Sequence, residues 1–169
     1  GNVLGSAGSV VPLFKEQIAK GGPLTVTHKD MTRYFMTIKE ACQLIVQSMV
    51  LSSKGDIHVL DMGKPISILA LANRMISLSG KIPNTDIKVV ISGLRAGEKL
   101  HEQLYYDVEK LKHTRHKKIF HITSAITQLD SYEDQLNIAI KQAINFQERE
   151  LIKSIKELVP EFVQQTVVK

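Results

Sequence analysis

The sequence has one cysteine, no tryptophan and only 5% aromatic residues, and its apolar residues form no long continuous run. The single cysteine, Cys42, excludes a disulfide within the chain and argues against a cysteine-based zinc site. It falls in a helical pattern, where we expect a small buried residue. No apolar stretch approaches the roughly 20 residues that cross a bilayer, so we expect no membrane span.

The chain also lacks an initial Met and a basic-then-apolar signal segment. Its first residues, Gly-Asn-Val-Leu-Gly, are typical of the end of a strand, so we expect the chain to begin inside a longer protein. A reducing cytoplasm fits the cysteine usage. What is present is ordinary for a globular protein: 169 residues, 43% hydrophobic and 23% charged. The net charge of +5 suits an anionic partner, whether nucleic acid, a membrane surface or a phosphorylated small molecule.

Strand and helix patterns alternate along the chain, which favours an α/β fold. The predicted strands lie at residues 1–4, 24–27, 32–37, 56–61, 87–91 and 117–122. Helices are predicted over 10–20, 38–50 and 67–80, with a further short helix at 98–104. One long or two short amphipathic helices are expected over 132–158. The tail at 162–169 is expected to be disordered or to form a short strand.

Three segments place polar groups on loops that leave strands, where α/β proteins bind ligands. Residues 1–12 are rich in small residues, and the helix start after them can face a phosphate. Residues 31–35 hold Arg33, and residues 93–100 hold Arg95 and Glu98. Two arginines can neutralise a pyrophosphate, and a carboxylate can accept hydrogen bonds from ribose hydroxyls. Taken alone, each segment is more often a solvated arginine or a helix cap.

Four motifs follow one another in unbroken order: Gly-Asn-Val-Leu-Gly-Ser-x-Gly-Ser-Val-Val-Pro-x-Phe, Thr-Val-Thr-x-x-x-Met-Thr-Arg-Tyr-Phe-Met-Thr, Leu-Asp-Met-Gly-x-Pro and Gly-Leu-Arg-x-Gly-Glu-Lys-Leu. Together they resemble UDP-N-acetylglucosamine 4,6-dehydratases, which are extended short-chain dehydrogenase/reductase enzymes of polysaccharide biosynthesis. The resemblance covers residues 1–122 as a nucleotide-sugar-binding portion and leaves 123–169 as a C-terminal helical extension. It implies the C-terminal part of a Rossmann-like fold whose cofactor-binding half is absent.

The resemblance also implies a role for eight residues in binding a UDP-sugar. By position, Asn2, Arg33 and Arg95 would contact the diphosphate, Ser9 and Val10 would lie where a helix start meets the nucleotide, Thr25 and Thr27 would border the uracil, and Glu98 would hold the ribose. We therefore expect these residues to converge on one cleft. Ala96 stands where the family usually has proline, which loosens the loop before Glu98 and affects affinity more than ligand class.

In the family, NADP and the catalytic Thr/Ser and Tyr-x-x-x-Lys lie upstream of the segment that this chain resembles. The glycines of residues 1–8 do not have G-x-G-x-x-G spacing, and residues 93–99 lack the Gly-Lys-Ser/Thr ending of a P-loop. Tyr106 and Lys110 fit Tyr-x-x-x-Lys but come at the wrong place in the order. We therefore expect no catalytic, cofactor-binding or metal-binding residue in this chain. The parent protein would be an NADP-dependent UDP-sugar 4,6-dehydratase, a lyase, or an epimerase, and this portion would be inactive alone.

A basic run over residues 110–118 contains or adjoins His113, His116 and His121. Neighbouring cations oppose a metal site there, and a nucleic-acid patch would require steeply salt-dependent binding. We favour a solvated loop or an interface, and expect no nucleic-acid partner.

The segments at 1–4 and 38–50 are expected to lie against the missing N-terminal cofactor domain, so their exposed apolar faces predict a homo-oligomer. The alternative function is a freestanding nucleotide-sugar-binding or assembly module without enzymatic activity.

Overall fold

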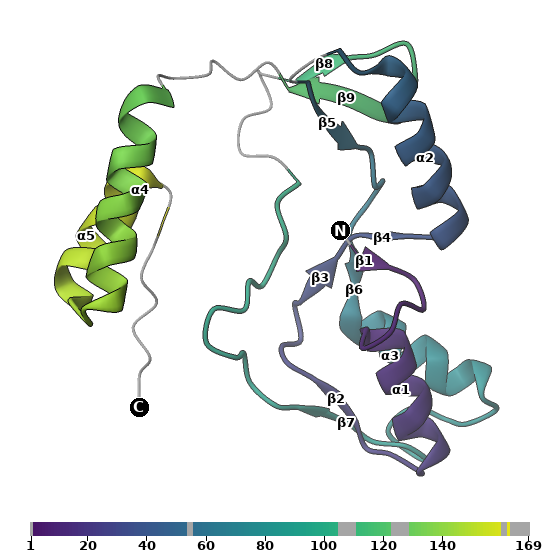
Figure 1. Cartoon of the computed structure of the whole chain (residues 1–169). Helices are drawn as coiled ribbons and strands as arrows, with labels where there is room; N and C mark the ends of the chain where they lie inside the picture. Colours follow the sequence, from purple (N-terminus) through teal and green to yellow (C-terminus); the bar gives the residue numbers. More distant parts are fainter. Residues whose placement is uncertain (1, 54–55, 105–110, 123–128, 160–161, 163–169) are drawn as a thin grey trace. The chain divides into compact units, whose positions relative to one another are not determined.

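The computed structural model describes residues 2–53, 56–104, 111–122, 129–159 and 162, in two compact units. The first unit, Gly1–Thr123, mixes helices and strands, and the second, Ser124–Lys169, is helical where it is described (Figure 1). The mixed α/β class predicted from the sequence is confirmed. The Tyr-x-x-x-Lys segment at 106–110 and the tail beyond residue 162 lie outside the described residues.

The elements of the first unit lie close to the predicted positions. Its helices are α1 (Val10–Ala19), α2 (Ile38–Leu51) and α3 (Ile68–Leu78). Its strands are β1 (Asn2–Val3), β2 (Leu24–Val26), β3 (Thr32–Arg33), β4 (Phe35–Met36), β5 (Ile57–Leu60), β6 (Ile66–Ser67), β7 (Val89–Ile91), β8 (Leu111–His113) and β9 (Ile119–Ile122). The second unit contains α4 (Leu129–Ile144) and α5 (Glu148–Leu158).

Short ladders join strands that are far apart in the sequence. β1 pairs in parallel with β4, and β2 in parallel with β7. β3 and β6 are antiparallel, and β5, β9 and β8 form an antiparallel three-stranded sheet. Because β2 and β7 run in the same direction, the loops that follow them leave from the same edge.

The main core lies between α1, α3 and β2, which are neighbours in Figure 1. Its buried members are Phe14, Leu24, Val26, Met31, Ile68, Ala72, Ile76 and Ile87. β2 alternates between buried and exposed residues, so Leu24 and Val26 enter this core while Thr25 points away from it. A smaller cluster of Met36, Leu44 and Ile119 joins β4, α2 and β9.

The short helix predicted over residues 98–104 is wrong, because that segment contains no helix. Its backbone bonds across to β3 instead. The Leu100 carbonyl accepts from the Thr32 amide at 3.2 Å, and His101 forms an isolated parallel bridge with Thr32. These contacts use backbone groups that a helix would have bonded within itself.

Two expectations for single segments also need correction. Cys42 is exposed, not buried. Cys42 lies two positions before the buried Leu44. Residues two positions apart in a helix are separated by about 200° around its axis, so the side chains of Cys42 and Leu44 point in opposite directions. The basic run is not entirely a loop, because residues 111–113 form β8 and pair with β9.

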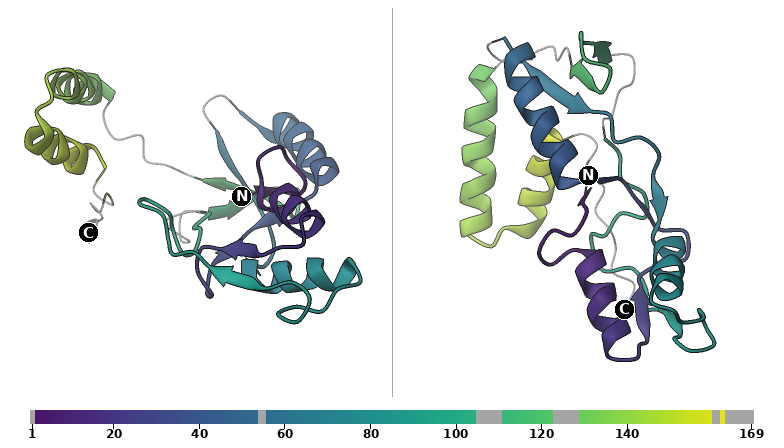
Figure 2. Two further views of the ribbon diagram at one scale, coloured as in Figure 1. Left: turned by 90° about the horizontal axis from the view of Figure 1, so that it is seen from below. Right: turned by 90° about the vertical axis from the view of Figure 1, so that its right-hand side faces the viewer.

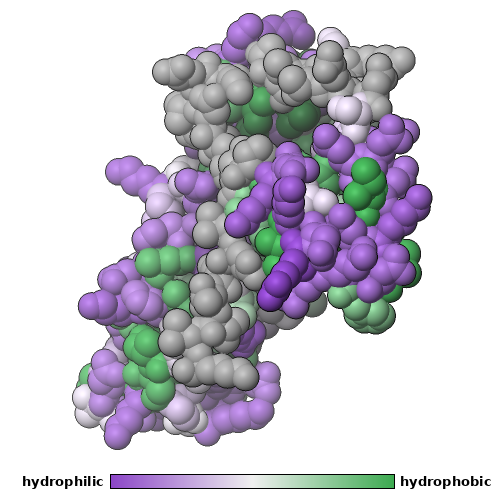
Figure 3. Space-filling view, turned by 90° about the vertical axis from the view of Figure 1, so that its left-hand side faces the viewer, coloured by the Kyte–Doolittle hydropathy of each residue, from purple (hydrophilic) through white to green (hydrophobic). Residues whose placement is uncertain are grey.

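α2 carries apolar residues on two sides. One side buries Leu44 beside Met36 and Ile119, whereas the other exposes Val46 and Met49, the latter 72% exposed. Figure 3 is seen from the left of Figure 1, away from α2, and on that face apolar areas likewise lie among hydrophilic ones. The structure thus leaves the apolar outer side of α2 exposed, and its burial against a partner stays a prediction.

α4 and α5 lie side by side as a helical hairpin (Figure 2). The sequence left one long helix or two short ones open, and the structure has two. The chain turns at Phe146, a residue that is 94% exposed and whose φ of 55° is left-handed. The amide of Gln147 then bonds to the Gln142 carbonyl and closes the end of α4. Throughout the described residues, every helix is too short or too polar to span a bilayer.

Replacing Val46 and Met49 together by Glu should reduce self-association, because the change places two charges on the exposed apolar side of α2. Sedimentation velocity at several concentrations measures this. Unfolding stability should change by no more than about 0.5 kcal/mol for each surface site. As a control, Leu44→Ala removes a buried side chain and should cost about 2–5 kcal/mol. Unchanged association in the double variant would show that this side of α2 is not the self-associating surface.

Candidate functional site

All eight residues that the sequence singled out line one cleft of about 270 Å³ in the first unit. They are Asn2, Ser9, Val10, Thr25, Thr27, Arg33, Arg95 and Glu98. These residues come from the start of the chain, the β2 segment, β3 and the loop after β7. The predicted convergence is therefore seen in the structure, while the ligand contacts assigned to each residue stay predictions.

The parallel pair β2–β7 brings the two central loops of the cleft together. Thr27 directly follows β2, and Ser92 and Arg95 follow β7. The Ser92 amide bonds to the Val26 carbonyl at 2.9 Å, which extends the ladder by one step toward the cleft. In open α/β sheets, ligands bind outside the carboxyl ends of such strands.

α1 begins at the cleft without a side-chain cap. The hydroxyl of Ser9 donates to the Ser6 carbonyl at 2.7 Å and does not accept from an amide of the first turn. Pro12 has no N–H, so the first turn offers the amides of Val10, which lines the cleft, and of Val11. A helix start with such amides attracts anions, because the backbone dipoles point their positive end toward it.

Arg33 is a largely enclosed cation, with a side chain 12% exposed. Its Nη1 donates to the carbonyl of Thr32 at 2.8 Å and to that of Leu100 at 3.2 Å. Its Nη2 lies 3.7 Å from Oε1 of Glu98, and its Nε lies 3.7 Å from Oε1 of Glu102. Backbone oxygens and carboxylates thus surround the guanidinium.

Glu98 connects both loops of the cleft. Its Oε1 accepts from the Thr27 hydroxyl at 3.3 Å, and its Oε2 accepts from the Arg95 amide at 3.2 Å. The Glu98 side chain is 23% exposed, so its carboxylate can also accept hydrogen bonds from a ligand hydroxyl.

Arg95 and Thr25 lie in contrasting surroundings. Arg95 is exposed on a turn between Gly93 and Gly97, both of which have positive φ, so this turn favours glycine at its two ends. Thr25 already has a partner: its hydroxyl accepts from Nε2 of Gln17 at 2.9 Å, and its amide donates to Oε1 of Gln17 at 3.1 Å. Arg95 can therefore reach a ligand more freely than Thr25.

Six further residues line the cleft that were not among the eight predicted site residues: Gly8, Leu13, Val26, Met31, Ile68 and Ser92. Gly8 and Met31 lie within the segments 1–12 and 31–35 that the sequence had singled out. Two others carried a signal in the sequence. Ser92 directly follows a predicted strand, and Ile68 directly follows Ser67, whose hydroxyl caps α3 by accepting from the Ala70 amide. The Ile68 amide bonds to the Met31 carbonyl at 3.0 Å, which attaches the start of α3 to the cleft.

The histidines lie outside the lining of this cleft. His121 Nε2 is 3.0 Å from Oδ1 of Asp56, and His58 Nδ1 is 2.7 Å from the Ser48 hydroxyl. The hydrogen bond from the Ser53 amide, followed by the two histidines, lowers the pKa of Asp56 below its ordinary value. Across the part of the chain that the structure describes, no three His, Cys, Asp or Glu side chains are grouped to hold a metal ion.

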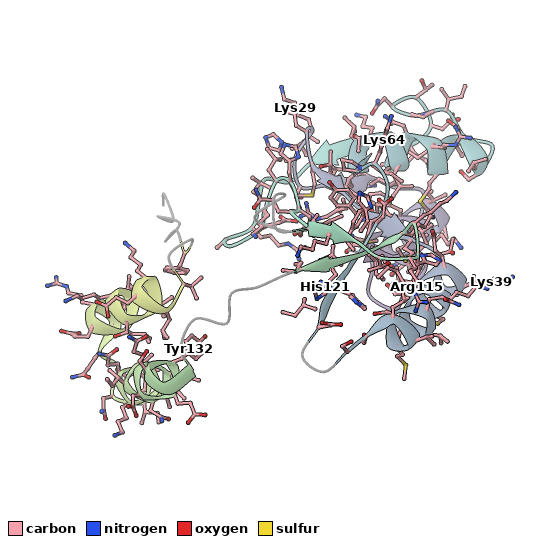
Figure 4. The ribbon with its side chains drawn as sticks, turned by 90° about the horizontal axis from the view of Figure 1, so that it is seen from above. Lys29, Lys39, Lys64, Arg115, His121 and Tyr132 are labelled. Carbon is pink, nitrogen blue, oxygen red and sulfur yellow. The ribbon has the colours of Figure 1, made fainter. Side chains whose placement is uncertain are left out.

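The basic residues are spread over the first unit. Lys39 and Arg115 lie at the α2 end in Figure 4, whereas Lys29 and Lys64 lie on the opposite side. Lys118 in the basic run pairs with Glu40 of α2, and that contact raises the pKa of Lys118. This distribution favours ordinary surface charges over one continuous nucleic-acid stripe.

The chain is similar in sequence to known proteins of one family. A family described as "Polysaccharide biosynthesis protein" matches residues 1–124. The capsular polysaccharide biosynthesis protein CapD of Staphylococcus aureus is 46% identical over 155 residues, which are 90% of this chain and 25% of CapD. The probable polysaccharide biosynthesis protein EpsC of Bacillus subtilis is 54% identical over 104 residues, or 62% of this chain and 17% of EpsC.

Relatives with more specific names match at lower identity. A UDP-N-acetylglucosamine 4,6-dehydratase (inverting) of Campylobacter jejuni is 36% identical over 60% of this chain and 28% of its own length. The X-ray structure of Pen from Bacillus thuringiensis has a TM-score of 0.65 and 34% identity, over 77% of this chain and 39% of that one. The chain thus spans a quarter or less of the length of CapD and EpsC.

Arg33→Ala should destabilise the fold, because it leaves two backbone carbonyls without their donor and two carboxylates without a cation. The expected loss is about 1–3 kcal/mol in urea unfolding. Arg95→Ala removes an exposed side chain and should change stability by at most about 0.5 kcal/mol. Equal stabilities of the two variants would contradict the enclosed position of Arg33.

Proposed function

The chain belongs to the polysaccharide biosynthesis protein family, and we propose that its cleft binds the nucleoside diphosphate of a nucleotide sugar. In this proposal it is the UDP-sugar-binding portion of a 4,6-dehydratase or epimerase of bacterial surface polysaccharide biosynthesis. The observation that carries the proposal is the convergence of eight residues from four segments on one cleft.

The donors of the cleft suit a diphosphate. The uncapped start of α1, Nη2 of Arg33 and the exposed Arg95 offer N–H groups to anionic oxygens. Asn2, from the short strand β1, adds a neutral amide to the same lining. The lining carries two arginines and one glutamate, so it is a cationic site that still contains a hydrogen-bond acceptor.

The hydrogen-bond acceptor of the cleft, the Glu98 carboxylate, suits the ribose of a nucleoside. Glu98 would accept from the ribose hydroxyls, and the Thr27 hydroxyl, which donates to Glu98, would orient that carboxylate. Thr25 would border the uracil from the edge of β2. Two relatives support a UDP-linked ligand by name: the dehydratase of Campylobacter jejuni and a UDP-glucose 4-epimerase of Rickettsia rickettsii, the latter 34% identical over 112 residues.

The chemistry itself would lie elsewhere in the longer protein. The glycines of residues 1–8 do not have the spacing of a dinucleotide-binding turn, so these residues do not fit NADP. We place NADP and the catalytic groups on the part of the parent protein outside this chain. Binding of the nucleoside diphosphate, which is remote from the reacting carbon, positions the sugar for reaction. This portion would therefore position the substrate and would catalyse nothing alone.

Calorimetric titration of the 169-residue chain with UDP, compared with TMP, tests the proposal. UDP should bind, and Arg95→Ala should weaken it by roughly 1.5–3 kcal/mol, the usual loss for a hydrogen bond to a charged group. Arg33→Ala should weaken it similarly, measured on protein that circular dichroism shows to be folded.

Arg74→Ala is the matched control, because Arg74 is an exposed arginine of α3 outside the cleft lining. Its UDP affinity should equal that of the unmodified chain. No change in UDP affinity in either cleft variant would defeat the assignment of the site.

A further inference from the structure

All three nitrogens of the Arg33 guanidinium face acceptors of the protein itself: two backbone carbonyls at Nη1 and one carboxylate each at Nε and Nη2. Nη1 donates to the carbonyls of Thr32 and Leu100, which accounts for both of its hydrogens. Nε faces the carboxylate of Glu102 at 3.7 Å. Nη2 lies 3.7 Å from Oε1 of Glu98, which is beyond hydrogen-bond distance, and Glu98 lines the cleft, so Nη2 can offer its hydrogens to a ligand there.

Glu102 lies behind this arrangement. It does not belong to the lining of the cleft, and it lines a separate hollow of about 340 Å³ together with Tyr34 and Asp61. Arg33 and Tyr34 are consecutive residues that line different cavities, so the chain between β3 and β4 forms a wall between the two. Glu102 reaches Arg33 from the far side of that wall.

We propose that Glu102 is a positioning residue for diphosphate binding: it holds the Nε edge of Arg33 so that Nη2 is aimed at the phosphate. The proposal rests on the proposed function of the cleft. The planar guanidinium can turn about its last side-chain bonds, and the ion pair at Nε together with the two hydrogen bonds of Nη1 restricts that freedom. Pre-orientation of this kind lowers the entropy cost of making each hydrogen bond to the ligand.

Glu102 would affect an anionic ligand in two opposite ways, which makes the sign of its effect informative. As a nearby negative charge it repels a diphosphate, so neutralising it would tighten binding. As the group that orients Arg33 it favours binding, so neutralising it would weaken binding. If Glu102 positions Arg33, neutralising it weakens binding; if Glu102 is only a neighbouring charge, neutralising it tightens binding.

Glu102→Gln in the full chain separates these outcomes by calorimetric titration with UDP and with uridine. We expect UDP to bind about tenfold more weakly, a typical coupling within one charged network. Uridine, which lacks phosphate, should bind as before. Glu16→Gln is the matched control, because it makes the same chemical change on α1 at an exposed position outside the cleft lining.

A second variant guards against a folding effect. Glu102→Asp keeps the charge but shortens the reach to Nε, so it should also weaken UDP while a charge effect alone would leave affinity unchanged. In an Arg33→Ala background, Glu102→Gln should have no further effect, because its action passes through Arg33.

Tighter or unchanged UDP binding in Glu102→Gln would overturn the positioning proposal alone, and so would an equal loss with Arg33 removed. Absence of UDP binding by the unmodified chain would instead overturn the proposed function of the cleft, and this proposal with it.

Discussion

The cleft depends on the parallel pairing of β2 with β7. Leu24, Thr25 and Val26 face Val89, Val90 and Ile91 in register, across more than 60 residues of sequence. Since parallel strands end on the same side, this ladder alone brings Thr27 next to the loop that holds Arg95 and Glu98. The hydrogen bond from Thr27 to Glu98 then closes the two loops on each other. The buried Leu24 and Val26 anchor the ladder in the core, which explains how such a short sheet can place polar groups accurately.

Much of the first unit could be predicted because its signals are local. Ser67 before an apolar helix, the glycines after α1 and the alternation of Leu24 and Val26 each indicate an element without reference to the rest of the chain. The order of four motifs likewise indicated which residues would meet at the cleft. The errors over residues 98–104 and over the basic run have one common cause, which is pairing with a distant partner, whereas the error at Cys42 comes from its position around the axis of α2.

The segment 98–104 has a composition suited to the start of a helix. Its Leu100 carbonyl instead accepts hydrogen bonds from the Thr32 amide and from Nη1 of Arg33. The sequence of β8 indicates a charged loop, and the segment forms a strand because it pairs with β9. No sequence pattern indicated Glu102, since its proposed role depends on how far its carboxylate is from a side chain nearly 70 residues earlier. Propensity and spacing do not contain such distances.

The uncapped start of α1 has a consequence for protein engineering. Asp at a helix N-cap is among the most reliable stabilising substitutions, and Ser9 is the position where a designer would introduce it. The new carboxylate would accept from the Val11 amide, since Pro12 has no N–H, and would place a fixed anion in the lining of the cleft. If the cleft binds a diphosphate as proposed, a more heat-resistant chain obtained in this way would bind that ligand more weakly, so screening for thermal tolerance alone would select against binding.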